Sequence, residues 1–132
     1  MNSFRSENTD NLNLKVVVIF ATKNEENTIE NSVFIAKKSY YKPKVLVVDA
    51  YSSDKTTELA ITAGAVVTQQ SKHLFPGKGL AMNEGLEEAI ERMSADIIVF
   101  LDADIRNLTT DWVNQLVGAI SDDNCDMSKR IL

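Results

Sequence analysis

The sequence contains one cysteine, Cys125, in 132 residues. A single cysteine excludes an internal disulfide, and it cannot by itself build a metal site. Proline and glycine are also scarce, at 2 and 5 residues, and no low-complexity tract or internal repeat is present in the sequence. Low cysteine use suits a reducing compartment, and we expect a cytoplasmic location.

Long hydrophobic runs are absent as well. The longest, Val16 to Ala21, is far shorter than the ~20 apolar residues that a transmembrane helix needs, and it ends against Lys23 and Glu25. The first residues are polar and contain no apolar segment of the kind found in secretion signals. We therefore expect no transmembrane segment, and we interpret residues 1–14 as a disordered lead-in.

Basic residues are fewer than acidic ones. The chain has 14 Lys and Arg against 19 Asp and Glu, which gives a formal net charge of -5, and no basic stripe is visible. A polyanion such as nucleic acid is therefore not an expected partner, although small anions can still bind at local sites. The length corresponds to one domain, since single domains most often have roughly 100–150 residues.

Short apolar runs alternate with segments of helical period, which is the pattern of βαβ units. The predicted strands are residues 15–22, 44–49, 65–68 and 96–101. The predicted helices are residues 24–38, 55–63, 80–93 and about 109–120. This pattern predicts an α/β fold with an open, mostly parallel sheet, flanking helices and the strand order 3-2-1-4.

The helical periodicity also predicts which side chains face the sheet. For the first helix these are Ile29, Val33 and Ala36. For the helix at 80–93 the predicted inward stripe is Ala81, Leu86, Ala89, Ile90 and Met93. For the last helix the stripe comprises Trp112, Val113, Leu116, Val117 and Ile120.

Two carboxylates follow the strand that contains the apolar run Ile97 to Leu101. Asp102 and Asp104 stand two residues apart at its exit, which is where open α/β sheets bind ligands. Hard oxygen ligands of this kind suit Mg²⁺ or Mn²⁺, which are often held by one or two carboxylates together with substrate phosphates. The structural alternative is an acidic turn that caps the next helix.

In the order 3-2-1-4, the strand exits bring Glu25, Asp49, Asp102 and Asp104 to one crevice. Such acids repel one another unless a cation or hydrogen-bond donors satisfy them, and a nucleoside diphosphate with a divalent ion provides both. Two alternatives stay open. Asp49 can act as a turn acid that accepts hydrogen bonds from the backbone of Ser52 or Asp54, and Glu25 can be an ordinary first-turn helix acid.

Lys78 supplies a complementary positive charge between Gly77 and Gly79, before a helix N-terminus that favours anions. The surrounding residues lack the P-loop pattern, and no Gly-x-Gly-x-x-Gly follows the first strand. ATPase and dinucleotide-binding interpretations therefore lose support. A solvated lysine in a glycine turn remains the structural alternative.

Five segments together resemble the donor-binding half of family 2 glycosyltransferases of the GT-A fold. In chain order they are VVVIFATKNEE, VLVVDAYSSDKTTELA, AGAVV, FPGKGLAMNEGL and DIIVFLDADI. The segments FPGKG and DADI are most similar to those of the glucosyl-3-phosphoglycerate synthases, which move glucose from UDP-glucose to 3-phosphoglycerate. The sequence departs from these relatives at Ala21, where many have proline, and at Ala50, where the synthases often have serine.

The resemblance implies a UDP-sugar partner, Mg²⁺ or Mn²⁺ as cofactor, and a set of site residues. Donor binding would fall to Thr22, Glu25, Asp49, Lys78, Asp102 and Ala103. Metal binding would fall to Asp104, with Asp102 beside it. Residues 15–132 would then form a truncated GT-A domain, because the acceptor-binding half of such enzymes follows the last predicted helix.

Two rival functions are compatible with the sequence. A catalytically silent binding or scaffold module would use its exposed C-terminal edge to bind a partner chain or a second copy of itself. A nucleotidyltransferase would share the α/β frame and the metal carboxylates. Its usual glycine-rich, arginine-containing loop is absent, however, because Ala21 to Glu26 contains no glycine.

Overall fold

The computed structural model describes residues 14–71, 78–105 and 107–123, in which four strands alternate with four helices. In chain order the elements are β1 (Val16–Thr22), α2 (Ile29–Lys37), β2 (Lys44–Asp49), α3 (Thr56–Thr62), β3 (Val66–Gln69), α4 (Lys78–Glu91), β4 (Ile97–Asp102) and α5 (Thr110–Asp123). All of the predicted elements in this part of the chain are present. The predicted lead-in lies outside the described residues except for Leu14, which packs against the core.

The sheet is parallel throughout and has the order β3-β2-β1-β4, which confirms the predicted topology. Val18 of β1 is opposite Val45 of β2 on one side and Val99 of β4 on the other. The two central strands are nearly continuous apolar runs because both of their faces are covered. Their carboxyl ends meet at one edge of the sheet.

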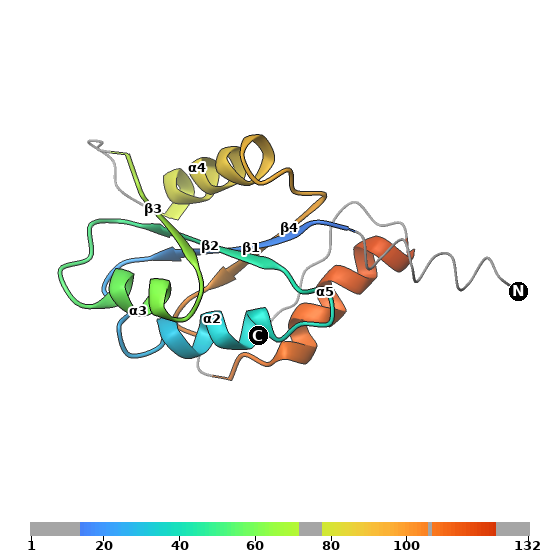
Figure 1. Ribbon diagram of the computed structural model, residues 1–132, viewed down its shortest axis with the longest axis horizontal. Helices are drawn as coiled ribbons and strands as arrows, with labels where there is room; N and C mark the ends of the chain where they lie inside the picture. The colour runs from blue at the N-terminus through green and yellow to red at the C-terminus, as the bar shows by residue number, and fades with distance from the viewer. Residues whose placement is uncertain (1–13, 72–77, 106, 124–132) are drawn as a thin grey trace, which may run out of the picture.

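The sheet lies between two layers of helix (Figure 1). α4 covers one face alone, over Val17, Ile19, Leu46 and Val48. The other face packs against α2, α3 and α5, and this larger core includes the predicted inward residues Val33 and Val113. α4 therefore shields this face of the central strands from solvent.

α2 begins at Ile29, about one turn later than the predicted helix. Asn24 has a φ of 54°, which lies in the left-handed region and cannot start a right-handed helix. The backbone N–H groups of Thr28 and Ile29 then close a turn on the carbonyl of Glu25, at 3.1 and 2.9 Å. Residues 24–28 are thus a connecting turn at the edge of the sheet.

The predicted inward stripe at 80–93 is right for Ala81, Ala89 and Met93, which pack on the face of the sheet that α4 covers, and wrong for Leu86 and Ile90. Ala81 and Ala89 are buried, whereas Leu86 and Ile90 are 37% and 54% exposed. The physical reason is the close approach of the helix to the sheet at Gly85. A Cβ built there would lie 2.9 Å from Ile19 Cγ2, so the packed face follows the four-residue spacing of the small side chains.

We expect Gly85→Ala to destabilise the fold by about 1–3 kcal/mol, because the added methyl group overlaps Ile19 and lies 3.2 Å from Val48 Cγ2. Urea denaturation measures this loss. Gly79→Ala on the same helix is the matched control. A Cβ there meets no atom of the described residues within 4 Å, and alanine favours a helix over glycine by up to about 1 kcal/mol. Equal effects of the two substitutions would contradict the close packing at Gly85.

Candidate functional site

A pocket of about 340 Å³ opens at the carboxyl edge of the sheet. Residues from all four strand exits line it, together with one residue from α4. They are Ala21, Thr22, Lys23, Glu25, Ala50, Gln70, Ala81, Asp102, Ala103 and Asp104. The pocket includes the place between β1 and β4 where the strand order reverses, which is the usual ligand position in open α/β sheets.

Five of the predicted site residues line this pocket: Thr22, Glu25, Asp102, Ala103 and Asp104. The structure therefore brings the acids after β1 and β4 together, as the strand order predicts. The side chain of Lys78 lies outside the described part of the structure. Its backbone begins α4, and Ala81, one helical turn later, reaches the pocket wall.

Asp49 lies behind the pocket wall, fully buried at 0% exposure. One carboxylate oxygen accepts hydrogen bonds from the hydroxyls of Thr22 and Ser52, at 2.7 and 2.6 Å, and the other accepts from the backbone N–H of Ser52 at 2.8 Å. This is the turn-acid arrangement that the sequence left open. Asp49 thus ties the end of β1 to the loop after β2.

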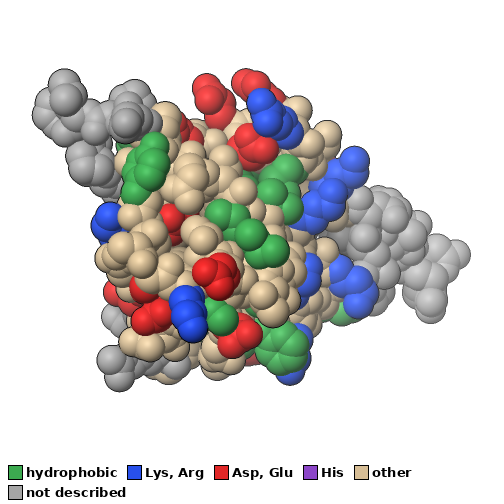
Figure 2. Space-filling view, turned by 60° about the vertical axis from the view of Figure 1, so that its left-hand side comes forward, with side chains coloured by type: hydrophobic (Ala, Val, Ile, Leu, Met, Phe, Trp, Pro, Cys, Tyr) green, Lys and Arg blue, Asp and Glu red, His purple; other side chains and the backbone are tan. Residues whose placement is uncertain are grey.

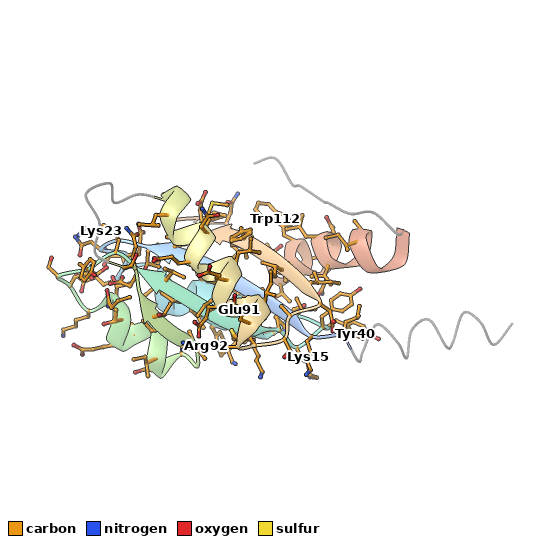
Figure 3. All side chains as sticks on the ribbon, turned by 90° about the horizontal axis from the view of Figure 1, so that it is seen from above. Lys15, Lys23, Tyr40, Glu91, Arg92 and Trp112 are labelled. Carbon is orange, nitrogen blue, oxygen red and sulfur yellow. The ribbon has the colours of Figure 1, made fainter. Side chains whose placement is uncertain are left out.

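Lys23 makes a second connection between these loops. Its Nζ donates to the carbonyls of Ala50 and Tyr51, at 2.9 and 3.2 Å. Tyr51 has a φ of 55°, a costly conformation for a bulky residue, and the Lys23 contact helps to hold it. Figure 3 shows Lys23 at the carboxyl end of the sheet, at the opposite end of the molecule from Lys15 and Tyr40.

Asn24 completes the link between the loops. Its backbone N–H donates to Ser52 Oγ at 2.8 Å, and its side-chain oxygen accepts from the backbone N–H of Ser53 at 2.8 Å. These reciprocal bonds replace the secondary-structure bonds that an irregular segment lacks. The pocket wall formed by the two loops is therefore held in shape by the protein's own contacts.

Thr56, the first residue of α3, positions the backbone of Glu25. Its hydroxyl oxygen accepts from the Glu25 N–H at 2.8 Å and donates to a carboxylate oxygen of Asp54. Desolvation acts to raise the pKa of Asp54, but the side-chain and backbone hydrogen bonds from Thr56 and the backbone bond from Glu26 lower it below its ordinary value. Asp54 is therefore a carboxylate at neutral pH.

The turn after β4 presents its two acids while its middle residue anchors it. Ala103 is 2% exposed and packs into the core, and its carbonyl accepts a hydrogen bond from Ser32 of α2 at 3.3 Å. Asp102 and Asp104, on either side, are exposed and line the pocket. Within the described residues, no group of three or more metal-ligating side chains is present. The pair fits Mg²⁺ or Mn²⁺, which take one or two carboxylates and complete their shell with phosphate oxygens and water.

Outside the predicted donor- and metal-binding set, Lys23 and Gln70 line the pocket, and Ser52 supports its wall. Gln70 directly follows β3, so the rule that strand exits bind ligands would have identified it had it been applied to the third strand. Lys23 and Ser52 act through backbone carbonyls and through Asp49. The bond from Ser52 to Asp49 was one of the alternatives that the sequence left open, whereas no sequence pattern marks the Lys23 contacts, because they depend on how two loops meet.

Comparison with known proteins assigns the chain to a family. The sequence pattern described as "Glycosyl transferase family 2" matches residues 17–129. The chain belongs to this family. It is 32% identical over 117 residues to a glucosyl-3-phosphoglycerate synthase from Petrotoga mobilis, an alignment that covers 81% of this chain and 35% of the relative. The chain spans about a third of the length of the curated relatives that it matches.

Solved structures agree with the sequence comparison. A glucosyl-3-phosphoglycerate synthase from Mycobacterium tuberculosis in complex with Mn²⁺, UDP-glucose and phosphoglyceric acid matches with a TM-score of 0.70 and 30% identity, over 81% of this chain and 39% of that one. The same enzyme in complex with Mg²⁺ and UDP matches with a TM-score of 0.73 and 28% identity, over 88% and 42%. The fold is thus the open parallel sheet with flanking helices of GT-A glycosyltransferases.

Proposed function

We propose that the chain binds a nucleotide sugar, UDP-glucose, with Mg²⁺ or Mn²⁺, as the donor-binding part of a glycosyltransferase that acts on a small phosphorylated acceptor such as 3-phosphoglycerate. The observation that carries this proposal is the pocket itself. It gathers the acids of β1 and β4 with the start of α4 at the switch point of a family 2 sheet. The relatives with solved complexes bind UDP or UDP-glucose with these cations.

The proposed roles follow from the chemistry of each group. Asp104, with Asp102 beside it, would hold the divalent cation, which neutralises the diphosphate and so supports its departure. Thr22, Glu25 and Ala103 would form the wall against the nucleoside. Asp49 would act by fixing that wall from behind, as its three hydrogen bonds indicate.

Lys78 completes the proposed site at the start of α4. An N-terminal helix end attracts anions through its free N–H groups, and a lysine there adds a full positive charge. The acceptor would have to be held in line with the sugar by further groups, because positioning supplies much of the rate of such transfers. Donor binding and glucose transfer are therefore two separate parts of the proposal, and the second also requires groups that hold the acceptor.

Calorimetric titration of the chain with UDP, with and without Mn²⁺, tests the proposal. We expect measurable binding that strengthens when Mn²⁺ is added and returns to the metal-free level with a chelator. Absence of UDP binding in both conditions would contradict the proposed function. Binding without glucose transfer to 3-phosphoglycerate would favour the silent binding module over the enzyme.

Location and partners follow the same proposal. Within the described residues, no helix combines the length and the apolar character that crossing a bilayer demands. We propose a cytoplasmic location and no nucleic acid partner. Four glutamates and Arg92 surround a hollow beside α4, and the acidic surface over this helix at the top of Figure 2 would repel a phosphate backbone.

A further inference from the structure

Gln70 lines the pocket, and the contacts within the described structure leave its side-chain oxygen without a hydrogen-bond donor. Only 2% of the residue is exposed, and its Oε1 has no hydrogen-bond partner within the described structure. A buried acceptor without a donor costs free energy, so a native structure seldom keeps one without a reason. The residue also lines the pocket, so its amide stands beside the space where a ligand would lie.

The backbone fixes where Gln70 stands. Its N–H donates to the carbonyl of Asp49 at 2.7 Å, so the residue continues the β2–β3 pairing just past the end of β3. In the strand order β3-β2-β1-β4, Gln70 and the Asp102–Asp104 turn are at opposite ends of the pocket. Three spacings of about 4.8 Å separate the two outer strands, a span that suits an extended nucleoside diphosphate.

The inference rests on the proposed function, and the arrangement of the pocket orients the nucleotide that this function requires. With the diphosphate and cation at the acids after β4, the base points toward β3. Three alanines, Ala21, Ala50 and Ala81, line the pocket and offer the small apolar surface that a flat ring requires. Asp49 is a poor candidate for contacting the base, because its carboxylate is buried and already accepts three hydrogen bonds.

We propose that Gln70 recognises the nucleobase of the donor, and that its Oε1 accepts a hydrogen bond from N3–H of uracil. N3–H is the one ring N–H that uracil keeps when N1 carries the ribose, and an unsatisfied acceptor requires a donor of this kind. The oxygen has less than 1 Å² of exposed surface, so binding includes a rotation of the terminal amide toward the pocket. The last torsion of a glutamine has a broad energy profile, and this rotation costs little.

The first test changes the ligand and leaves the protein intact. Calorimetry in Mn²⁺ compares UDP with its N3-methyl derivative, which lacks the proposed donor. We expect the derivative to bind about tenfold more weakly, the usual effect of one lost hydrogen bond that leaves a buried acceptor unpaired. Equal affinities would overturn the inference while leaving the proposed function in place. If UDP itself does not bind, the proposed function and the inference both fail.

The second test changes Gln70 to methionine, which has a similar volume and no amide. UDP binding should weaken about tenfold, whereas binding of the N3-methyl derivative should change by less than about twofold, because that ligand cannot make the bond. Gln115→Met is the matched control, since Gln115 is exposed on α5 and its amide nitrogen donates to Asp111 at 2.9 Å. An equal loss for both ligands would overturn the assignment to N3–H.

Thermal unfolding of the ligand-free variant separates recognition from a structural role. Removing an unsatisfied buried acceptor should raise the Tm of Gln70→Met by about 2–6 °C. A glutamine needed for the fold would give the opposite sign. A lowered Tm together with unchanged UDP affinity would therefore overturn the proposal.

Discussion

Replacing Asp104 by asparagine is expected to remove the effect of Mn²⁺ on UDP binding. The carboxylate is exposed at the pocket, next to an anchored turn, and the amide keeps its shape while losing the charge that a hard cation requires. Interactions of this charged kind contribute about 1.5–3 kcal/mol, so UDP affinity in Mn²⁺ should fall about 10- to 100-fold. Calorimetric titration with and without the metal measures the change.

Asp96→Asn provides the matched control for charge. Asp96 precedes the same strand at the opposite edge of the sheet, is exposed, and accepts a hydrogen bond from the backbone N–H of Lys15 at 2.8 Å. Its substitution changes the net charge equally but should leave the metal effect intact. If Asp104→Asn still binds UDP as tightly as the unmodified chain in Mn²⁺, the proposed cation site is wrong.

Asp49→Ala is expected to destabilise the fold by about 3–5 kcal/mol, a large part of the stability of a small domain. The substitution removes an acceptor of three hydrogen bonds from a fully buried position and leaves the donors of Thr22 and Ser52 without it. Urea denaturation followed by circular dichroism gives the free energy of unfolding.

An exposed aspartate gives the comparison for this loss. Asp111 accepts one hydrogen bond, from Gln115, on the surface of α5, and Asp111→Ala should cost less than about 1 kcal/mol. The difference between the losses of unfolding free energy in the two variants measures how much the buried hydrogen bonds of Asp49 contribute to stability. Similar losses for both variants would show that the link between β1 and the loop after β2 contributes little.

The role of Asp49 illustrates how sequence patterns can place a residue correctly and leave its function open. Its position after a buried strand puts it at the edge where ligands bind, and the structure confirms that position. Whether it faces the pocket or the protein depended on Thr22, the last residue of β1, and on Ser52, in the loop after β2. The Ser52 contacts are local, whereas Thr22 is 27 residues away along the chain, and only folding brings its hydroxyl to the same carboxylate.

α4 shows the same limit for packing. Its existence follows from its apolar period, but the buried face is set by the contact of Gly85 with Ile19 and Val48. Helical periodicity gives large apolar residues the most weight, so Leu86 and Ile90 were wrongly predicted to face the sheet. Close approach of backbone to sheet favours the small residues instead, and the larger ones are left exposed.

The sequence alone determined the strand and helix order, the parallel sheet with the order 3-2-1-4, and the pair of acids that leaves β4. These features depend on local apolar period and on the right-handed connection of parallel strands, which are properties of neighbouring residues. Tertiary structure alone decided that Asp49 supports the wall, that Lys23 holds the carbonyls of the next loop, and that Gln70 keeps an unsatisfied oxygen beside the pocket. Those outcomes depend on distances between segments far apart in the chain, and such distances exist only after the sheet has brought its strand exits together.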